Sequence, residues 1–238
     1  MPVAIQSITM CGRFRLSRTE KQIAEHFDTP DEVEWSPRYN IAPAQPVAVV
    51  RQNPERTVRQ FSLMRWGLIP CWAKDANIGY KMINARAETI AEKPAFRESF
   101  KSRRCLIPAD GFYEWKKVGK VKQPFHFGMH DDSIFGFAGI WDRWKNPLGQ
   151  IIETCSILTT TPNALLADVH DRMPVIMPLG HYDLWLDPGF KNTDDLKAML
   201  LPYVPSLMKR YPVSTRVNLV KNDDPDCARE LKQQSVSA

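Results

Sequence analysis

Glycine is scarce in this sequence, and the features of several specialised protein classes are missing. Only 11 of the 238 residues are glycine, which excludes collagen-like chains, where glycine makes up about one-third of the residues. No apolar run approaches the roughly 18 residues that a membrane-spanning helix requires. The first nine residues, MPVAIQSIT, lack the basic region and the long apolar region of a secretory signal. We therefore expect a cytoplasmic protein with no membrane partner.

Cysteine is also sparse, and its spacing shows no pairing. The five cysteines are Cys11, Cys71, Cys105, Cys155 and Cys227. Their number is odd and none of them forms a C-x-x-C pair, whereas a disulfide framework needs an even set and a zinc site needs closely spaced ligands. The pattern therefore predicts neither disulfides nor a bound metal, and it fits a reducing compartment.

Charge of one sign is only slightly in excess. Lysine and arginine number 32 against 27 aspartates and glutamates, which gives a formal net charge of +5 and a sequence pI of about 8.9. Strongly basic nucleic-acid-binding domains have a pI above about 9, so this balance permits a nucleic-acid partner without identifying one. Hydrophobic and charged fractions of 43% and 25% are those of an ordinary soluble globular protein.

Proline, in contrast, is abundant at 19 residues, and a chain of this kind turns often and forms few long helices. No linker, repeat or low-complexity tract divides the sequence, so we expect a single domain over residues 10–222. Residues 1–9 would then be an N-terminal extension or a misassigned start, and residues 223–238 a polar C-terminal tail.

Short β-branched and aromatic runs separated by turns predict an α+β protein with an antiparallel, partly closed sheet. A hairpin is expected from residues 46–51 and 57–66. Further strands are expected at 105–109, 112–118, 124–129, 134–141 and 151–160.

Capping signals predict a few short helices. Ser17 and Glu20 have the S-x-x-E spacing of a capping box ahead of a short amphipathic helix that ends before Pro30. Asn163 and Thr193 can each cap a further short helix directly after them.

Met10-Cys11 is the first unusual chemical feature. If the methionine were excised, Cys11 would carry a free α-amine together with its thiol. An α-amine has a pKa of roughly 8, so part of it is unprotonated at neutral pH and can attack an aldehyde, after which the thiol can close on the imine. The ordinary alternative is a buried or inert thiol.

Three polar residues further along the chain could assist such chemistry. Asn84 lies among apolar neighbours and could be an orienting group or a turn residue. Glu114 shares a strand face with an aromatic residue, and burial of that face would raise its pKa and suit it to proton transfer, whereas an edge strand would leave it facing water. His170 precedes Asp171 and Arg172 and could act as an acid–base group, although the end of a helix also favours histidine for structural reasons alone.

Two tryptophans and three arginines could hold nucleic acid. Trp66 and Trp72 flank a turn among cations, and aromatic residues interleaved with cations form a platform on which unpaired bases stack, each stack contributing roughly 1–3 kcal/mol. Arg13, Arg86 and Arg172 are candidates for phosphate contacts. The ordinary alternatives are core packing for the tryptophans and solvated surface charge for the arginines.

Together these segments resemble the SRAP (SOS response-associated peptidase) family of abasic site processing proteins. The resemblance rests on short motifs that occur in the family's order between residue 10 and about residue 222. They are MCGRF (10–14), RYNIAP (38–43), WG (66–67), INARAET (83–89), GFYEW (111–115), QPF (123–125) and HDRMP (170–174).

The resemblance implies an α+β fold with a largely antiparallel, β-barrel-like core and short flanking helices. It implies that the protein senses abasic sites in single-stranded DNA and forms a covalent thiazolidine crosslink to them through Cys11, which shields the site in the DNA damage response. The Schiff-base step implies lyase-like activity, and the family name would accommodate autopeptidase activity. No metal and no organic cofactor are implied, and we expect a monomer that is nucleoid-associated when bound to DNA.

By motif position, the resemblance implies catalytic roles for four residues. Cys11 would supply the amine and the thiol, and Asn84 would orient it. Glu114 would shuttle protons, and His170 would assist sugar ring opening and crosslink reversal. DNA contacts are expected at Arg13, Arg86, Arg172, Trp66, Trp72, Asn40 and Thr159.

The position of the cysteine leaves two routes to a free amine. Either translation starts at Met10, which we favour because Met10 stands directly before Cys11, or the first ten residues are removed by processing. Two other functions stay open. One is a cysteine-type peptidase or amidohydrolase using Cys11 with His170 and Asn84, and the other is a non-catalytic single-stranded DNA binder. Neither of these requires a free α-amine, whereas the crosslink does.

Overall fold

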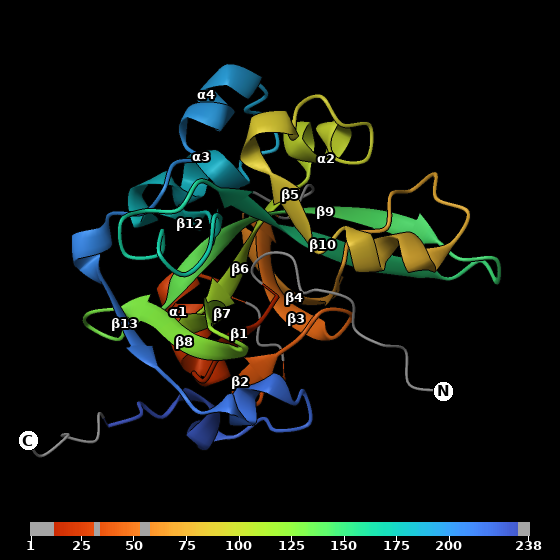
Figure 1. The fold of residues 1–238 in the computed structure, drawn as a ribbon. Helices are drawn as coiled ribbons and strands as arrows, with labels where there is room; N and C mark the ends of the chain where they lie inside the picture. Colours follow the sequence, from red (N-terminus) through yellow and green to blue (C-terminus); the bar gives the residue numbers. More distant parts are fainter. Residues whose placement is uncertain (1–11, 31–33, 53–57, 233–238) are drawn as a thin grey trace, which may run out of the picture.

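Five strands of the protein close into a barrel (Figure 1). The structure is a computed structural model that describes residues 12–30, 34–52 and 58–232, so Cys11 lies outside the described residues. In the order in which they pair around the ring, the strands are β10 (Ile151–Thr160), β4 (Arg59–Trp66), β3 (Pro46–Gln52), β6 (Arg104–Ala109) and β9 (Phe135–Lys145), and β9 pairs again with β10. The β10–β4 contact is parallel and the others are antiparallel. This confirms the expected largely antiparallel, barrel-like core.

A second sheet of five antiparallel strands lies beside the barrel. Its order is β13 (Met208–Pro212), β8 (Val121–Met129), β7 (Gly111–Val118), β1 (Phe14–Leu16) and β2 (Arg38–Ile41). Short strands extend the barrel's ladders: β5 (Asn84–Arg86) and β11 (Met173–Pro174) pair with β10, and β12 (Ile176–Met177) pairs with β9.

An aromatic cluster joins the two sheets. The Phe14 ring of β1 lies 5.2 Å from Trp66 of β4 and 5.8 Å from Phe137 of β9, and Phe112 of β7 lies 5.9 Å from the same Phe137 ring. All four side chains are fully buried. Edge-to-face aromatic pairs add about 0.5–1.5 kcal/mol each beyond the burial of their area. The cluster therefore holds β1 and β7 firmly against the barrel.

Short helices flank the strands, as expected for an α+β protein. In Figure 1, α2, α3 and α4 gather at one end of the barrel. No helix among the described residues is long and apolar enough to cross a membrane. The α-helices are α1 (Glu20–Phe27), α2 (Arg97–Ser102), α3 (Tyr182–Leu186) and α4 (Thr193–Ala198), and the 3-10 helices are η1 (Ala76–Lys81), η2 (Ala87–Thr89), η3 (Leu179–His181), η4 (Pro205–Leu207), η5 (Thr215–Asn218) and η6 (Pro225–Ala228).

The predicted start of α1 is wrong by two residues. Thr19 caps the helix, and its side chain and that of Gln22 form the reciprocal bonds of a capping box. Ser17 is not the cap, because its backbone amide donates a 3.0 Å hydrogen bond to Asp110 and its hydroxyl also contacts that carboxylate. The S-x-x-E spacing of Ser17 and Glu20 is therefore coincidental.

The two later helix predictions are corrected as well. α4 is capped by Asn192 rather than by Thr193. Asn163 does accept bonds from the amides two and three residues ahead, but residues 164–169 form turns instead of a helix. Nucleating a helix is costly, and this segment is bonded to β7 and β13 through the side chain of Asp168.

The C-terminal segment packs against the domain beyond the predicted boundary at residue 222. Asp223 accepts a 2.8 Å hydrogen bond from the amide of Asn40. Cys227 is fully buried, and the amide of Leu231 donates a 2.9 Å bond to the end of β13. The described chain therefore packs against the domain as far as Leu231, and the boundary at residue 222 stays a prediction.

Candidate functional site

The register between β1 and β7 brings a buried carboxylate to the start of the described chain. The two strands are antiparallel, with Phe14 opposite Phe112. Continuing this register by two residues places Gly12 opposite Glu114. Gly12 is buried, and Glu114 is only 3% exposed. Glu114 therefore lies beside the residue that is bonded to Cys11.

The burial of Glu114 is itself informative. Removing a carboxylate from water is unfavourable unless the protein supplies hydrogen bonds or counter-charges, and buried ionisable groups of this kind gather at functional sites. The buried strand face is also the condition under which proton transfer by Glu114 is expected from the sequence.

β5 presents Asn84 and Arg86 on one face. β5 runs parallel to β10, with Asn84 beside Ile157. Because side chains alternate along a strand, Asn84 and Arg86 share a face, and Ala85 between them is buried in the core. Asn84 is half-buried and Arg86 is exposed, so this face looks outward from the barrel.

The loop that carries His170 is tied to the strand that carries Glu114. Lys116 lies two residues from Glu114 on the same face of β7, and its Nζ donates a 2.6 Å bond to Asp168. Arg210 of β13 contacts the same carboxylate. These two cations hold the pKa of Asp168 far below its usual range, first through the arginine hydrogen bond and then through the lysine. The loop is thereby held over β7.

His170 has a partner for each of its charge states. Its Nδ1 lies 3.0 Å from the amide nitrogen of Arg172 and 3.0 Å from Oδ1 of Asp171. A neutral Nδ1 can accept the amide hydrogen, which leaves the ring proton on Nε2, whereas a protonated Nδ1 can donate to the carboxylate. The two arrangements exclude one another. The ring can therefore hold a hydrogen-bond partner both as an acceptor and as a donor at Nδ1.

Arg172 clamps the His170 segment to the end of β10 and to the segment after β5. Its two terminal nitrogens donate to the Glu88 carboxylate at 2.6 and 2.8 Å, and one of them also donates to the Thr159 carbonyl at 2.7 Å. The arginine hydrogen bond is the main reason that the pKa of Glu88 lies below its usual value. The segments bearing Asn84 and His170 are therefore linked at one end of the barrel.

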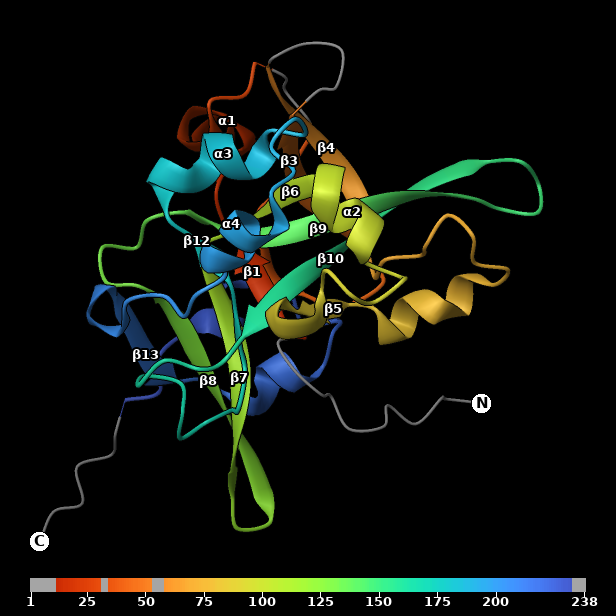
Figure 2. The same cartoon turned by 90° about the horizontal axis from the view of Figure 1, so that it is seen from above.

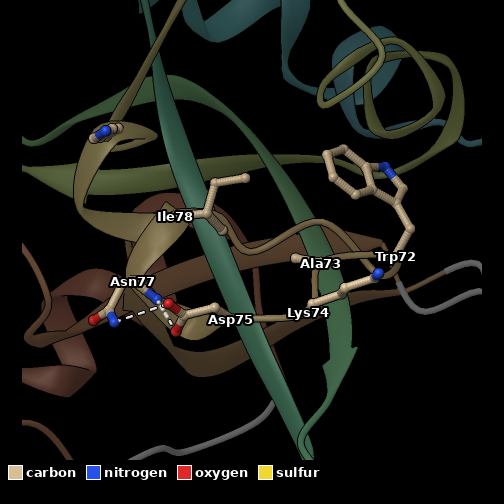
Figure 3. Close-up of a pocket in the computed structure, with 7 residues that line it drawn as sticks. Trp72, Ala73, Lys74, Asp75, Asn77 and Ile78 are labelled. Carbon is tan, nitrogen blue, oxygen red and sulfur yellow. Dashed lines mark hydrogen bonds between the residues drawn. The ribbon is translucent and has the colours of Figure 1, made fainter.

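Two of the predicted DNA-binding residues are exposed as that role requires. Trp72 is 57% exposed and lies at one side of a hollow of about 350 Å³, with Asn77 at the other side (Figure 3). Arg86 is exposed on β5. Sequence reasoning missed Tyr80, which is 59% exposed in the same segment as Trp72 and has the guanidinium of Arg65 5.5 Å above its ring.

The predicted DNA contacts of Trp66 and Thr159 stay predictions, and both side chains have contacts inside the protein. Neither side chain is exposed. Trp66 belongs to the aromatic core, and its indole nitrogen donates a 2.8 Å bond to the carbonyl of Ile83, which fixes the start of β5. Thr159 serves the Arg172 clamp through its carbonyl. Both residues therefore support the site from within the protein.

The predicted DNA contact of Asn40 also stays a prediction, and the Asn40 side chain is fully buried. Its Nδ2 lies 2.7–3.1 Å from the carbonyls of Val217, Leu219 and Asn222, and its Oδ1 accepts a 2.9 Å bond from Arg13. Asn40 therefore fastens the C-terminal segment to β2.

Arg13 and Arg172 are almost buried, and both donate to protein oxygen atoms. Burial is the main reason that the pKa of Arg13 lies below its ordinary value. A phosphate contact by either arginine stays a prediction.

The groups that hold the site together were not found from the sequence. Lys116, Asp168 and Arg210 come from three distant segments, and nothing in their local patterns marks them. Glu88 lies within the INARAET motif, so the motif itself was the available signal. Within the described residues, no group of three or more histidine, cysteine, aspartate or glutamate side chains could hold a metal ion.

Comparison with protein families gives one match over most of the chain. Residues 10–220 match the model of the family described as SOS response associated peptidase (SRAP). The match begins at Met10, directly before Cys11.

Relatives and solved structures agree with that match. The Abasic site processing protein YoqW of Bacillus subtilis (strain 168) is 45% identical over 221 residues, covering 91% of this chain and 98% of the relative. The Abasic site processing protein HMCES of Gallus gallus is 32% identical over 226 residues, covering 82% of this chain and 67% of the relative. A crystal structure of a Bacteroides thetaiotaomicron protein, 27% identical, superposes with a TM-score of 0.85 over 93% of this chain and 100% of that one.

Proposed function

This chain belongs to the SOS response associated peptidase (SRAP) family, and from that membership we propose that it processes abasic sites in single-stranded DNA by crosslinking to them through Cys11. The observation that carries the proposal is the β1–β7 register, which, continued by two residues, sets buried Glu114 opposite Gly12, the residue bonded to Cys11. The names of its relatives, abasic site processing proteins, support the same substrate.

The proposed reaction has two bond-forming steps. The α-amine of Cys11 attacks C1′ of the ring-opened abasic sugar, and loss of one water gives an imine. The thiol then adds to the imine carbon while its proton passes to the nitrogen, which closes a thiazolidine ring. One C–N bond and one C–S bond form, the aldehyde oxygen leaves as water, and no oxidant or reductant is needed.

Three side chains would assist these steps. Glu114 would take the proton from the amine and return it to the departing hydroxyl. Its burial opposite Gly12 supports this role. Asn84 would orient the Cys11 amine. His170, which has one partner for the neutral ring and another for the cation, would protonate the sugar ring oxygen during opening and serve the reverse reaction.

The imine stage would also permit strand cleavage. An imine at C1′ acidifies the C2′ protons, so β-elimination of the 3′ phosphate becomes possible while the imine persists. Ring closure by the thiol removes the imine and protects the strand. Lyase-like activity should therefore increase when the thiol is lost and the amine is kept.

The proposal requires a form of the protein that begins at Cys11. Translation from Met10 followed by removal of that methionine would supply it, and so would cleavage after Met10. Arg86 and Trp72 would bind the flanking DNA from their exposed positions, with Arg13 and Arg172 as further candidates.

The test is a crosslinking reaction resolved on a denaturing gel. The form beginning at Cys11 is incubated with a labelled single-stranded oligonucleotide that carries one abasic site. We expect a shifted band that Cys11→Ala abolishes and that Cys71→Ala, which removes an exposed thiol, leaves unchanged. Glu114→Gln should slow the appearance of the band without weakening binding to undamaged DNA.

Other outcomes would favour the other two functions. Release of residues 1–10 from the full chain, with no DNA band from the form that this release produces, would favour a cysteine-type peptidase. DNA binding by the form beginning at Cys11 without any band would favour a simple binder. Either result would contradict the crosslinking proposal.

A further inference from the structure

A cluster of lysines occupies a hairpin that projects from the second sheet. We call residues 116–122 (KKVGKVK), at the β7–β8 turn, the lysine arm. It contains four lysines and no acidic residue. Figure 2 shows the β7–β8 hairpin extending away from the rest of the molecule.

The charges of the lysine arm are arranged unfavourably for the isolated protein. Lys117 lies directly opposite Lys122, and like charges at such cross-strand positions destabilise a hairpin. Lys117, Lys120 and Lys122 are all exposed. Among the described residues, the lysines that form ion pairs with carboxylates are Lys21, Lys101, Lys116 and Lys209. These three exposed lysines are not among them. The arm therefore holds three neighbouring cations whose repulsion a bound anion would relieve.

The turn keeps these cations close together and accessible. Gly119 and Lys120 form a two-residue connection between β7 and β8, and Gly119 has a φ of 60°, which is typical of tight hairpin turns with glycine at the first position. A side chain at Gly119 would meet no atom within 4 Å. The tip thus stands in open space with lysines on both of its strands.

The lysine arm continues directly from the candidate site. Lys117 is three residues along β7 from Glu114, which corresponds to about 10 Å at roughly 3.3 Å per residue. Lys116, at the base of the arm, holds the His170 loop through Asp168. Lys117 and Lys122 lie on the other face of the hairpin from Glu114, so a DNA strand whose reacting sugar lies at Glu114 would meet the arm where its neighbouring phosphates pass around the hairpin.

We propose that the lysine arm binds backbone phosphates of the DNA that flanks the abasic site. This inference rests on the proposed function, because it takes its ligand from the crosslinking reaction. The arm would recognise phosphate groups, and the flanking DNA that supplies them is either single-stranded or paired. Contacts with phosphates position the nucleic acid without reading its sequence. Lysine suits such contacts because its ammonium group is a point charge on a flexible side chain.

The test compares two variants of equal net charge. The arm variant is Lys117→Gln/Lys120→Gln/Lys122→Gln. The control variant is Lys93→Gln/Lys191→Gln/Lys197→Gln, beside α2 and α4, which lie away from the arm in Figures 1 and 2. Each removes three charges and lowers the formal net charge from +5 to +2.

Binding to undamaged DNA is measured by fluorescence anisotropy at several salt concentrations. For a single strand, each neutralised phosphate contributes about 0.7 to the slope of log K against log salt. We expect the arm variant to lower the magnitude of this slope by about 2 and the control variant to leave it unchanged. Equal slopes for the arm variant and the unmodified protein would overturn the proposal.

Two further measurements identify the source of the phosphates and separate the two proposals. An oligonucleotide with a paired flank and one without are compared, and the flank whose binding depends on the arm is its ligand. Binding of poly-glutamate that depends on the arm, with DNA binding that does not, would indicate an acidic protein partner and overturn the inference. Because these assays use undamaged DNA, a missing crosslink would contradict the proposed function while the slope still decides the role of the arm.

Discussion

We expect the substitution Asn40→Ala to lower the free energy of unfolding by about 3 kcal/mol. Asn40 is fully buried, its Nδ2 faces three backbone carbonyls at 2.7–3.1 Å, and its Oδ1 accepts a bond from Arg13. Two N–H groups can satisfy about two of those carbonyls, at about 1 kcal/mol each, and the charge-assisted bond contributes about 1.5–3 kcal/mol. The sum is about 4 kcal/mol, and Arg13 recovers part of it because it also donates to the Val217 carbonyl.

Urea denaturation of the two proteins measures this difference directly. The matched control is Asn218→Ala in the same C-terminal segment, because that exposed side chain accepts a single bond, from the Trp115 indole at 2.7 Å. The control should cost less than about 1 kcal/mol. If Asn40→Ala unfolded like the unmodified protein but bound single-stranded DNA more weakly, Asn40 would be a DNA contact and the structural role assigned to it would be refuted.

Three further predictions concern neighbouring groups. Trp72→Ala should weaken single-stranded DNA binding by about 1–3 kcal/mol without loss of stability, whereas Trp66→Ala should cost about 3–5 kcal/mol of stability; anisotropy titrations and denaturation of both variants check this. Glu88→Gln should lower the free energy of unfolding by about 1 kcal/mol, which is less than the loss of a buried ion pair would cost, because the Glu88 side chain is 48% exposed. The same substitution should slow crosslinking. The control Glu92→Gln should change neither the stability nor the crosslinking rate. Since the contact with Arg172 lowers the pKa of Glu88 from 4.5, its contribution is complete above about pH 4.5 and is lost as the pH falls through the lowered value. The stability difference between Glu88→Gln and the unmodified protein should therefore be constant from pH 7 to 5 and shrink in more acidic solution.

The strands were largely predictable from the sequence because their signal is local. The predicted hairpin is confirmed as β3–β4, and the five later strands are confirmed as β6–β10. Alternation and turn residues such as Gly119 specify these elements without long-range information. The closure of the barrel, in contrast, depends on β10 pairing with both β4 and β9, and no local pattern encodes which distant strands meet.

The burial of motif residues was the least predictable property of the site. Trp66 and Trp72 stand six residues apart in the same kind of sequence, yet one is in the core and the other is exposed. Asn40 lies in a motif that invites a binding role, but its partners come from residues 217–222. Motifs identify which residues matter, and only the fold shows which of them are buried and which are exposed.

Intact-mass spectrometry of the form beginning at Cys11, before and after incubation with an abasic oligonucleotide and without borohydride, tests the central claim most directly. The account predicts a denaturation-resistant adduct whose mass is that of the protein plus the oligonucleotide minus one water, formed by the unmodified protein and absent for Cys11→Ala. A protein with a free Cys11 amine that gains no mass, or an adduct of the same mass that persists in Cys11→Ala, would contradict it.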